Sequence, residues 1–324
     1  MLKNPNHFTG HIWLIIILLF ASIGCTKSDE ETIEDHINQY PELEAAYDRH
    51  DPVESNEFSL FNQNIITKNL IEVSGIVSGR KNKKVVYMHE DSGNRNVVFV
   101  FDTTGLFLGE IILVGVQNRD WEDIAIGPGP KPGVNYIYVG DIGDNRSGRP
   151  HLFIHRFEEP SFTIDENNPF RIEVDDFNTI KYEYPDGARD AETLMIDPES
   201  KDLIIITKRE VNVHVYQLPY PQRTDGENAT IYFRGRLPFR TIVGGDISPD
   251  GNEIVIKDYG AVYHWNNAGS NIVETIFNVA PNQVEYIPEV QGESIGWTWK
   301  GDGYFTITET EKIQADPILY HYKR

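Results

Sequence analysis

The chain has 324 residues and a formal net charge of −21, from 50 acidic and 29 basic side chains. This excess of acid argues against a nucleic-acid surface, which needs a stripe of Lys and Arg, and against electrostatic docking to anionic lipid. It favours cations or polar neutral molecules as partners.

The first 24 residues have the pattern of an export signal. An apolar run at 12–21 (IWLIIILLFA) is too short for a membrane-spanning helix, but it fits the hydrophobic region of a secretory signal peptide. The sequence Ser-Ile-Gly-Cys at 22–25 resembles the lipobox of bacterial lipoproteins, although Ser22 stands where Leu is preferred. We therefore predict that 1–24 is removed and that Cys25 is lipidated. A plain signal peptide or an uncleaved anchor is the alternative.

Cysteine content supports this prediction. Cys25 is the only cysteine, so the exported chain forms no internal disulfide, and a thioether-linked lipid removes a free exposed thiol. The sequence Thr-Lys-Ser-Asp-Glu-Glu at 26–31 resembles the surface-export signal of some Gram-negative lipoproteins, with a solvated tether as the alternative. We expect an acidic tether over 25–52 and a lipid anchor in the outer membrane, with the protein facing the cell surface.

A short pattern occurs five times after residue 52 and is the main structural signal. Its copies are EVSGIVSG (72–79), DWEDIAIG (120–127), DAETLMID (190–197), VGGDISPD (243–250) and QGESIGWT (291–298). Each copy is followed by an apolar strand that ends in a charged residue, and most then by a third strand rich in Val, Ile, Tyr and Phe. Four short strands in each unit of about 40–50 residues indicate a β-propeller. We therefore predict an all-β domain over 53–324.

The repeats predict five blades. The longer spacing between the second and third copies indicates an insertion around 161–170 and leaves room for a sixth blade. The last unit ends at 320–324 before a fourth strand, so we expect 56–66 to supply that strand and to close the ring. No amphipathic helix is expected after residue 50. An irregular β-sandwich is the alternative fold.

The motifs, in their order, resemble those of an uncharacterised family of bacterial secreted and lipoprotein β-propellers. They are SGI (74–76), HEDSGN (89–94), DWEDIAIG (120–127), YVGDIGDN (138–145), YPDGARDAETL (184–194), GGDISPDG (244–251) and QGESI (291–295). More distantly, the chain is similar to phytase-like and esterase-like propellers and to sugar-lactonase propellers that bind a divalent cation. The distant resemblance implies an architecture rather than a function.

Both repeated patterns place charges at one rim of the propeller, because the first strand of a blade starts where the second strand ends. The acids are Glu122, Glu192 and Glu293 from the first pattern and Glu90, Asp141, Asp258 and Glu309 from the second, which also contributes Lys208. Carboxylates crowded around one axis repel unless a cation compensates them, and oxygen ligands favour a divalent cation, Ca²⁺ before Mg²⁺. The alternative is that several acids cap strand-edge amides or pair with Arg146, Arg189 and Lys208.

Two functions are compatible with this acidic mouth. The first is a surface-displayed, non-catalytic propeller that binds a small molecule, a glycan or a protein, with the cation at its mouth. The second is a metal-assisted hydrolase of phosphoesters, esters or lactones, with Glu122 or Glu293 as base and Lys208 or Arg146 stabilising the developing anion. The sequence contains no nucleophile elbow and no P-loop, which favours the binding protein.

Overall fold

The computed structural model describes residues 39–266, 271–311 and 315–324. The predicted signal peptide, Cys25 and the first part of the predicted tether lie outside these residues. Within the described ranges, no helix has both the length and the apolar character needed to cross a membrane.

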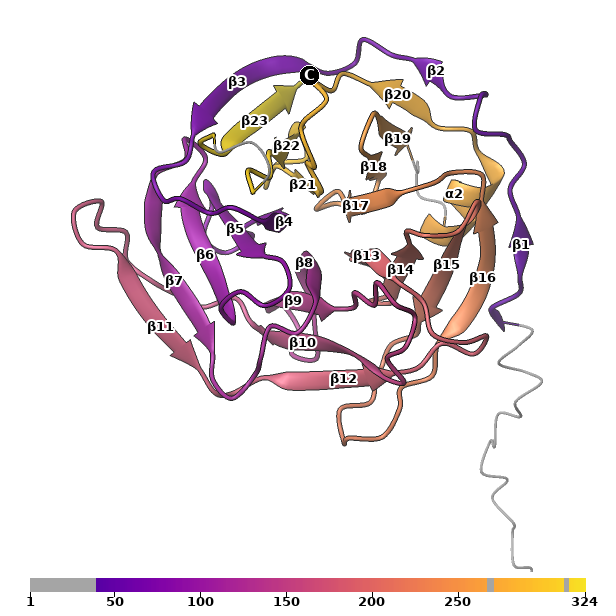
Figure 1. Cartoon of the computed structure of the whole chain (residues 1–324), viewed down its shortest axis with the longest axis horizontal. Helices are drawn as coiled ribbons and strands as arrows, with labels where there is room; N and C mark the ends of the chain where they lie inside the picture. Colours follow the sequence, from indigo (N-terminus) through magenta and orange to yellow (C-terminus); the bar gives the residue numbers. More distant parts are fainter. Residues whose placement is uncertain (1–38, 267–270, 312–314) are drawn as a thin grey trace, which may run out of the picture. The chain divides into compact units, whose positions relative to one another are not determined.

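Residues 40–324 form one compact unit of five sheets arranged around a central axis as a β-propeller (Figure 1). The innermost strands are β4 (Val73–Ser78), β8 (Trp121–Pro128), β13 (Ala191–Ile196), β17 (Ile242–Ile247) and β21 (Ser294–Trp297). Each contacts the next in that order, and β21 contacts β4, so the ring is closed. The predicted all-β propeller with five blades is confirmed, and the described residues contain no sixth blade.

Each blade runs outward from its inner strand through antiparallel neighbours, as the alternation of apolar strands and turns predicts. The second strands are β5 (Val85–Glu90), β9 (Asn135–Asp141), β14 (Leu203–Thr207), β18 (Glu253–Asp258) and β22 (Gly303–Ile307). The third strands are β6 (Val97–Asp102), β10 (Leu152–Glu158), β15 (Val213–Leu218), β19 (Val262–Asn266) and β23 (Ile318–Lys323). The fourth strands are β7 (Phe107–Leu113), β12 (Asn178–Tyr182), β16 (Tyr232–Leu237), β20 (Asn282–Val284) and β3 (Ser59–Ile65).

The ring closes by pairing strands from the two ends of the domain. β3 lies antiparallel to β23, with Ile65 opposite Ile318 (Figure 1). Phe58 lies directly before β3 and is buried. Its ring makes an edge-to-face contact with the ring of Trp297, which belongs to the same blade. The closure predicted from 56–66 is therefore confirmed, and it covers a sheet edge that would otherwise be open.

Three short strands extend the outer edges of the blades. β1 (Leu43–Glu44) and β2 (Val53–Glu54) lie parallel to β16 and β20, so β1 falls within the segment 25–52 that the sequence predicts as a tether. β11 (Phe170–Val174) comes from the chain between β10 and β12 and lies parallel to β7 of the preceding blade. The insertion predicted around 161–170 therefore leads into a strand that joins two blades.

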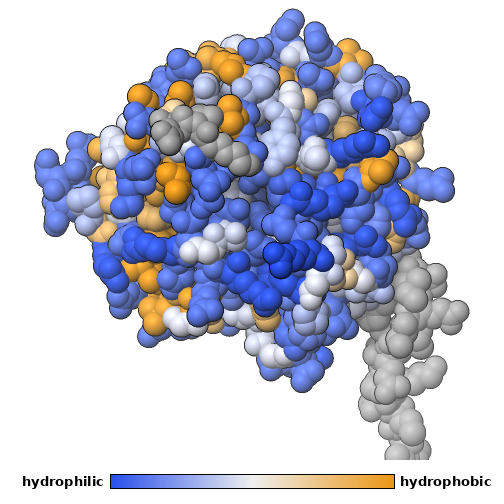
Figure 2. Space-filling model, viewed as in Figure 1, coloured by the Kyte–Doolittle hydropathy of each residue, from blue (hydrophilic) through white to orange (hydrophobic). Residues whose placement is uncertain are grey.

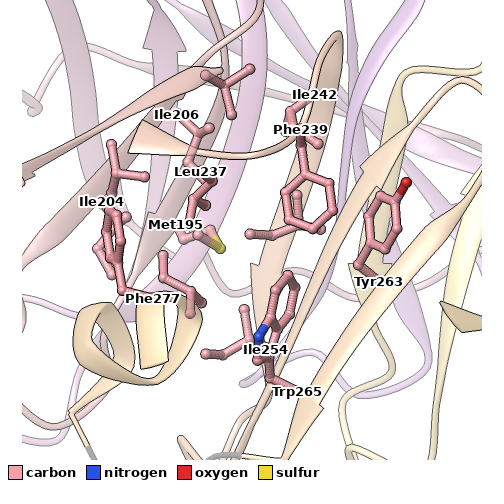
Figure 3. Close-up of a cluster of buried hydrophobic side chains, with 14 of the residues drawn as sticks. Met195, Ile204, Ile206, Leu237, Phe239, Ile242, Ile254, Tyr263, Trp265 and Phe277 are labelled. Carbon is pink, nitrogen blue, oxygen red and sulfur yellow. The ribbon is translucent and has the colours of Figure 1, made fainter. Parts of the chain in front are cut away.

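Apolar layers join neighbouring blades, and Figure 3 shows the layer between the blades that contain β14 and β18. Its labelled members include Ile204, Leu237, Ile254 and Trp265. Helix α2 (Ile272–Asn278) adds Phe277 to this layer; the helix was not expected, because its apolar pattern spans only seven residues. On the face seen in Figure 2, hydrophilic side chains cover the centre of the ring.

Candidate metal centre

Four of the five inner strands have an irregularity at the end where the second strands finish, and in β17 it falls at Val243. In β4, β8 and β13 a β-bulge leaves one residue without a partner in the ladder, and these residues are Ser74, Glu122 and Glu192. A bulge redirects the side chain of its extra residue. The Ser74 hydroxyl donates a hydrogen bond to the Glu122 carbonyl oxygen at 2.5 Å, so the bulges of neighbouring blades are in direct contact.

Glu122, Glu192 and Glu293 come together at this end of the axis. One carboxylate oxygen of each lies within 4.8 Å of an oxygen of the other two, and all three side chains are buried. Burial raises the pKa of Glu122 well above its ordinary value, and the charge of Glu192 raises it further. Burial and the charge of Glu293 likewise raise the pKa of Glu192. The structure thus brings together the three glutamates that share one position of the repeat.

One base compensates part of this negative charge. The ammonium group of Lys208 donates hydrogen bonds to Glu192 Oε1 and to Glu293 Oε1, the second at 3.1 Å. The Tyr259 hydroxyl also donates to Glu293 Oε1, at 2.6 Å. Glu192 Oε2, by contrast, has no hydrogen-bond partner within the described residues, although Glu192 is only 3% exposed. A buried carboxylate oxygen without a donor is destabilising unless a proton or a cation binds it.

A second group of carboxylates adjoins the first and shares Glu122 with it. Asp91, Asp120 and Glu122 each place an oxygen within 4.8 Å of the other two. Burial is the main cause that raises the pKa of Asp91 to about 7 and that of Asp120 to about 6, and neighbouring acids add to it. Both aspartates are partly exposed, so this side of the cluster is open to solvent.

Sequence reasoning missed Asp91 and Asp120, although a signal for one of them was present. Asp120 opens the second copy of the repeat, and acids open the first and third copies as Glu72 and Asp190. Asp91 follows Glu90 directly, one residue beyond the end of β5. Its direction is set by the loop rather than by the strand, and the repeat contains no information about that loop.

Gly143 leaves room for the acidic cluster. This glycine lies in the YVGDIGDN loop after β9, and its amide donates a hydrogen bond to the Asp120 carbonyl oxygen at 3.2 Å. A Cβ at this position would overlap Glu122 Oε1 and come within 2.7 Å of Asp120 Oδ2. Only glycine permits such a close approach of the backbone to both carboxylates.

Two of the remaining predicted acids are held by protein groups. Glu90 Oε1 accepts a hydrogen bond from the Ile71 amide at 2.9 Å. Asp141 forms a buried ion pair with Arg149 at 2.6 Å. These contacts correspond to the alternative that rim acids cap amides or pair with bases, although the sequence did not single out Arg149.

The structure also places Asp258 and Glu309 outside the cluster. Asp258 Oδ1 accepts hydrogen bonds from the amides of Gly260 and Ala261, both at 2.7 Å, and so caps the turn that follows β18. Glu309 forms a separate group with two other acids, Glu72 and Glu311. Of the seven predicted metal ligands, three therefore meet at the axis, and Asp91 and Asp120 join them.

The charge balance of this five-carboxyl cluster favours a cation. Its members are Asp91, Asp120, Glu122, Glu192 and Glu293. Within the described residues, Lys208 is the one base that forms an ion pair with any of them. Ionised carboxylates this close repel each other by roughly 1–4 kcal/mol per pair, depending on how well solvent screens them. A ligand set made only of carboxylate oxygens suits Ca²⁺ or Mg²⁺.

No known protein family matches the sequence, and no curated protein matches it. Among solved structures, the chain is similar to a luciferin-regenerating enzyme at 9% identity and a TM-score of 0.43, over 81% of this chain and 95% of that chain. Similarity at this level concerns the fold alone. The resemblance to bacterial secreted propellers stays a prediction.

Proposed function

We propose that this protein is a non-catalytic binding propeller that holds a divalent cation, Ca²⁺ before Mg²⁺, in the five-carboxyl cluster at its mouth. The cation would bind part of a ligand, which is a small molecule, a glycan or a protein. One observation carries the proposal: five carboxyl groups converge at the mouth, and within the described residues a single lysine forms ion pairs with any of them.

The two halves of the cluster differ in a way that indicates where the cation would bind. Lys208 is bonded to Glu192 and Glu293, so its ammonium group already occupies the side of the cluster that these two residues form. Among the described residues, no base forms an ion pair with Asp91 or Asp120, although the charge of Arg149 acts on Asp120, and both aspartates are partly exposed. If Asp91, Asp120 and the shared Glu122 bind the cation, several of the six to eight coordination positions of Ca²⁺ would stay open to water or to a ligand.

A metal-assisted hydrolase is the second candidate, because Glu122 lies in both halves of the cluster and its raised pKa favours a carboxyl group that can hold a proton. Lys208 would have to stabilise the developing anion in such a reaction. The contacts of Lys208 with Glu192 and Glu293 already compensate its charge, which lowers its value for that role. The binding function is therefore preferred.

We also propose that Cys25 carries a lipid that anchors the protein in the outer membrane, with the propeller at the cell surface. This proposal rests on the apolar run at 12–21, the Ser-Ile-Gly-Cys sequence and the acidic residues after Cys25. Several acyl chains on one cysteine would hold the protein stably on a membrane, whereas one chain would not.

Thermal unfolding with calcium, magnesium or a chelator tests the cation site. At a hundredfold excess over Kd, a cation that binds only the folded state stabilises it by about 2.7 kcal/mol, which should raise the melting temperature by roughly 5 °C or more. Glu122→Gln should reduce this shift because it removes a shared ligand. Glu227→Gln, which changes an exposed glutamate away from the mouth, is the matched control.

The outcomes separate the two candidates. Melting curves that coincide in calcium, magnesium and chelator would refute the cation site. Cation binding without turnover of generic phosphoester, ester and lactone substrates supports the binding propeller. Cation-dependent turnover that disappears in the Glu122→Gln variant would establish the hydrolase instead.

A further inference from the structure

A cavity lies at the end of the propeller opposite the acidic mouth. Turns and strand ends of the first blade (β4–β7) and of the last blade (β21, β22, β23 and β3) line it, together with Ile164 and Glu166 from the segment before β11. These turns join first to second strands and third to fourth strands, so antiparallel pairing places them at the far end from the mouth. The cavity has a volume of about 550 Å³, within the range of small-molecule sites.

Four lysines line this cavity, in a chain that is strongly acidic overall. They are Lys83, Lys84, Lys300 and Lys323. None of the four forms an ion pair within the part of the chain that the structure describes. An excess of positive charge in a concave site attracts an anion and raises its local concentration.

Three acids also line the cavity, namely Asp102, Glu166 and Asp302, and two of them are hydrogen-bonded within their own turns. Asp102 Oδ1 accepts hydrogen bonds from the amides of Thr104 and Leu106 and so caps the turn between β6 and β7. Asp302 Oδ1 accepts a hydrogen bond from the Thr298 hydroxyl at 2.7 Å. The four lysines outnumber the three acids by one, and within the described residues none of the four is paired with an acid, so the cavity keeps a net positive charge.

Accessible aromatic rings lie directly beneath the lysine ammonium groups. Those of Lys83 and Lys300 lie 4.8 Å and 5.3 Å from the centre of the Trp299 ring, which is half-buried. Lys323 lies 4.4 Å from the centre of the Phe61 ring, and Phe61 is 62% exposed. Cation–π contacts position an ammonium group without neutralising it. The cavity thus offers flat apolar surfaces next to positive charges.

We propose that this cavity binds an anionic oligosaccharide. The apolar faces of sugar rings would lie against Trp299 and Phe61, and carboxylate or sulfate substituents would pair with the lysines. A small inorganic anion would pair with the lysines but would leave the aromatic rings uncovered. A neutral sugar would pack against the aromatic rings but would leave the lysines unpaired. A sugar ring that carries a negatively charged substituent would pack against the aromatic rings and pair with the lysines at the same time. This site is separate from the proposed cation site at the mouth.

Tryptophan fluorescence provides a direct measurement. Trp121, Trp265 and Trp297 are almost completely buried, whereas Trp299 is accessible to a neutral quencher such as acrylamide. The full chain, purified in detergent with chelator present, would be titrated with tetragalacturonate, with a neutral tetrasaccharide and with hexaglutamate. The Trp299→Phe variant gives the background signal. We expect tetragalacturonate to protect Trp299 from quenching, and we expect its affinity to fall as salt rises.

Variants assign the binding to the cavity. Replacing Lys83 and Lys300 by Ala together should weaken tetragalacturonate binding at least tenfold. Lys131→Ala, which changes an exposed lysine on a turn of the neighbouring blade, should leave binding unchanged. Glu122→Gln should also leave it unchanged, so a failure of the cation site would not affect this result.

Three results would overturn the proposal. Absence of protection by tetragalacturonate would exclude the anionic oligosaccharide. Binding of hexaglutamate as tight as that of tetragalacturonate would identify an acidic peptide as the ligand class. Loss of tetragalacturonate binding in the Glu122→Gln variant would move the binding to the mouth.

Discussion

The cation-free protein should lose stability as the pH rises from about 4 to about 7. A carboxyl group whose pKa is raised in the folded state keeps its proton at pH values where the unfolded chain has released it. The folded state is therefore favoured at low pH, and this advantage disappears as the pH passes through the folded pKa. Asp91, with its pKa raised to about 7, and Asp120, with its pKa raised to about 6, define the upper part of this window.

Asp91 sets the scale of the effect. A rise of its pKa from 3.8 to about 7 corresponds to about 4 kcal/mol at full burial. Asp91 is partly exposed, and solvent screening reduces this figure to roughly 2 kcal/mol. Since 1 kcal/mol shifts the melting temperature of a large domain by about 2–4 °C, we expect a fall of roughly 4–8 °C between about pH 4 and pH 8.

Circular dichroism melts at several pH values, with chelator and with calcium, would measure this fall. Calcium should remove it, because a bound cation favours the ionised carboxylates. With chelator, Asp91→Asn should flatten the pH dependence, whereas Asp175→Asn, which changes an exposed aspartate, should not. A melting temperature that stays constant or rises over this range in chelator, or an Asp91→Asn variant with the parental slope, would refute the reasoning.

Three further predictions concern closure, the site and the anchor. Phe58→Ala removes a buried ring and should lower the free energy of unfolding by about 3–5 kcal/mol in urea titrations. Phe61→Ala changes an exposed ring on β3 and should lower it by less than about 0.5 kcal/mol. Equal effects of the two variants would argue against the closing contact of Phe58. Gly143→Ala should weaken calcium binding about 10- to 100-fold in calorimetry because its Cβ would displace two carboxylates. Gly148→Ala in the same loop would make only an ordinary contact with the Arg146 carbonyl oxygen at 3.9 Å, and equal affinities of the two variants would exclude this role of Gly143. Cys25→Ala should abolish acyl labelling and release the protein from membranes, and a labelled variant would rule out lipidation at this cysteine.

Repetition made part of the structure predictable from the sequence. A propeller repeats one backbone position around an axis, so residues that share a position in the repeat meet at the centre. Glu122, Glu192 and Glu293 could therefore be placed together from their alignment alone. The closure by 56–66 followed from the missing fourth strand of the last unit.

The rest of the site depends on loops that the repeat does not describe. Asp141 and Asp258 occupy the same position in their blades, but one meets Arg149 from the loop that follows it and the other caps its own turn. Asp91 and Asp120 each lie one residue outside a strand, where the loop backbone sets the direction of the side chain. The β-bulges were also not foreseeable, because one extra residue in a strand leaves the apolar pattern almost unchanged.

The route of the chain into β3 determines how the domain would respond to mechanical load. A pull on the residues before position 40 reaches β1 first, β2 second and β3 last. β1 and β2 are each held by two residue pairs, whereas β3 is held by six. Tension would therefore detach the two short strands and lengthen the slack chain before it reached the strand whose loss opens the ring. In a domain held to a surface by its N-terminal end, these two short pairings would separate first under tension. The closed ring, and with it the carboxylates of the mouth, would then stay intact.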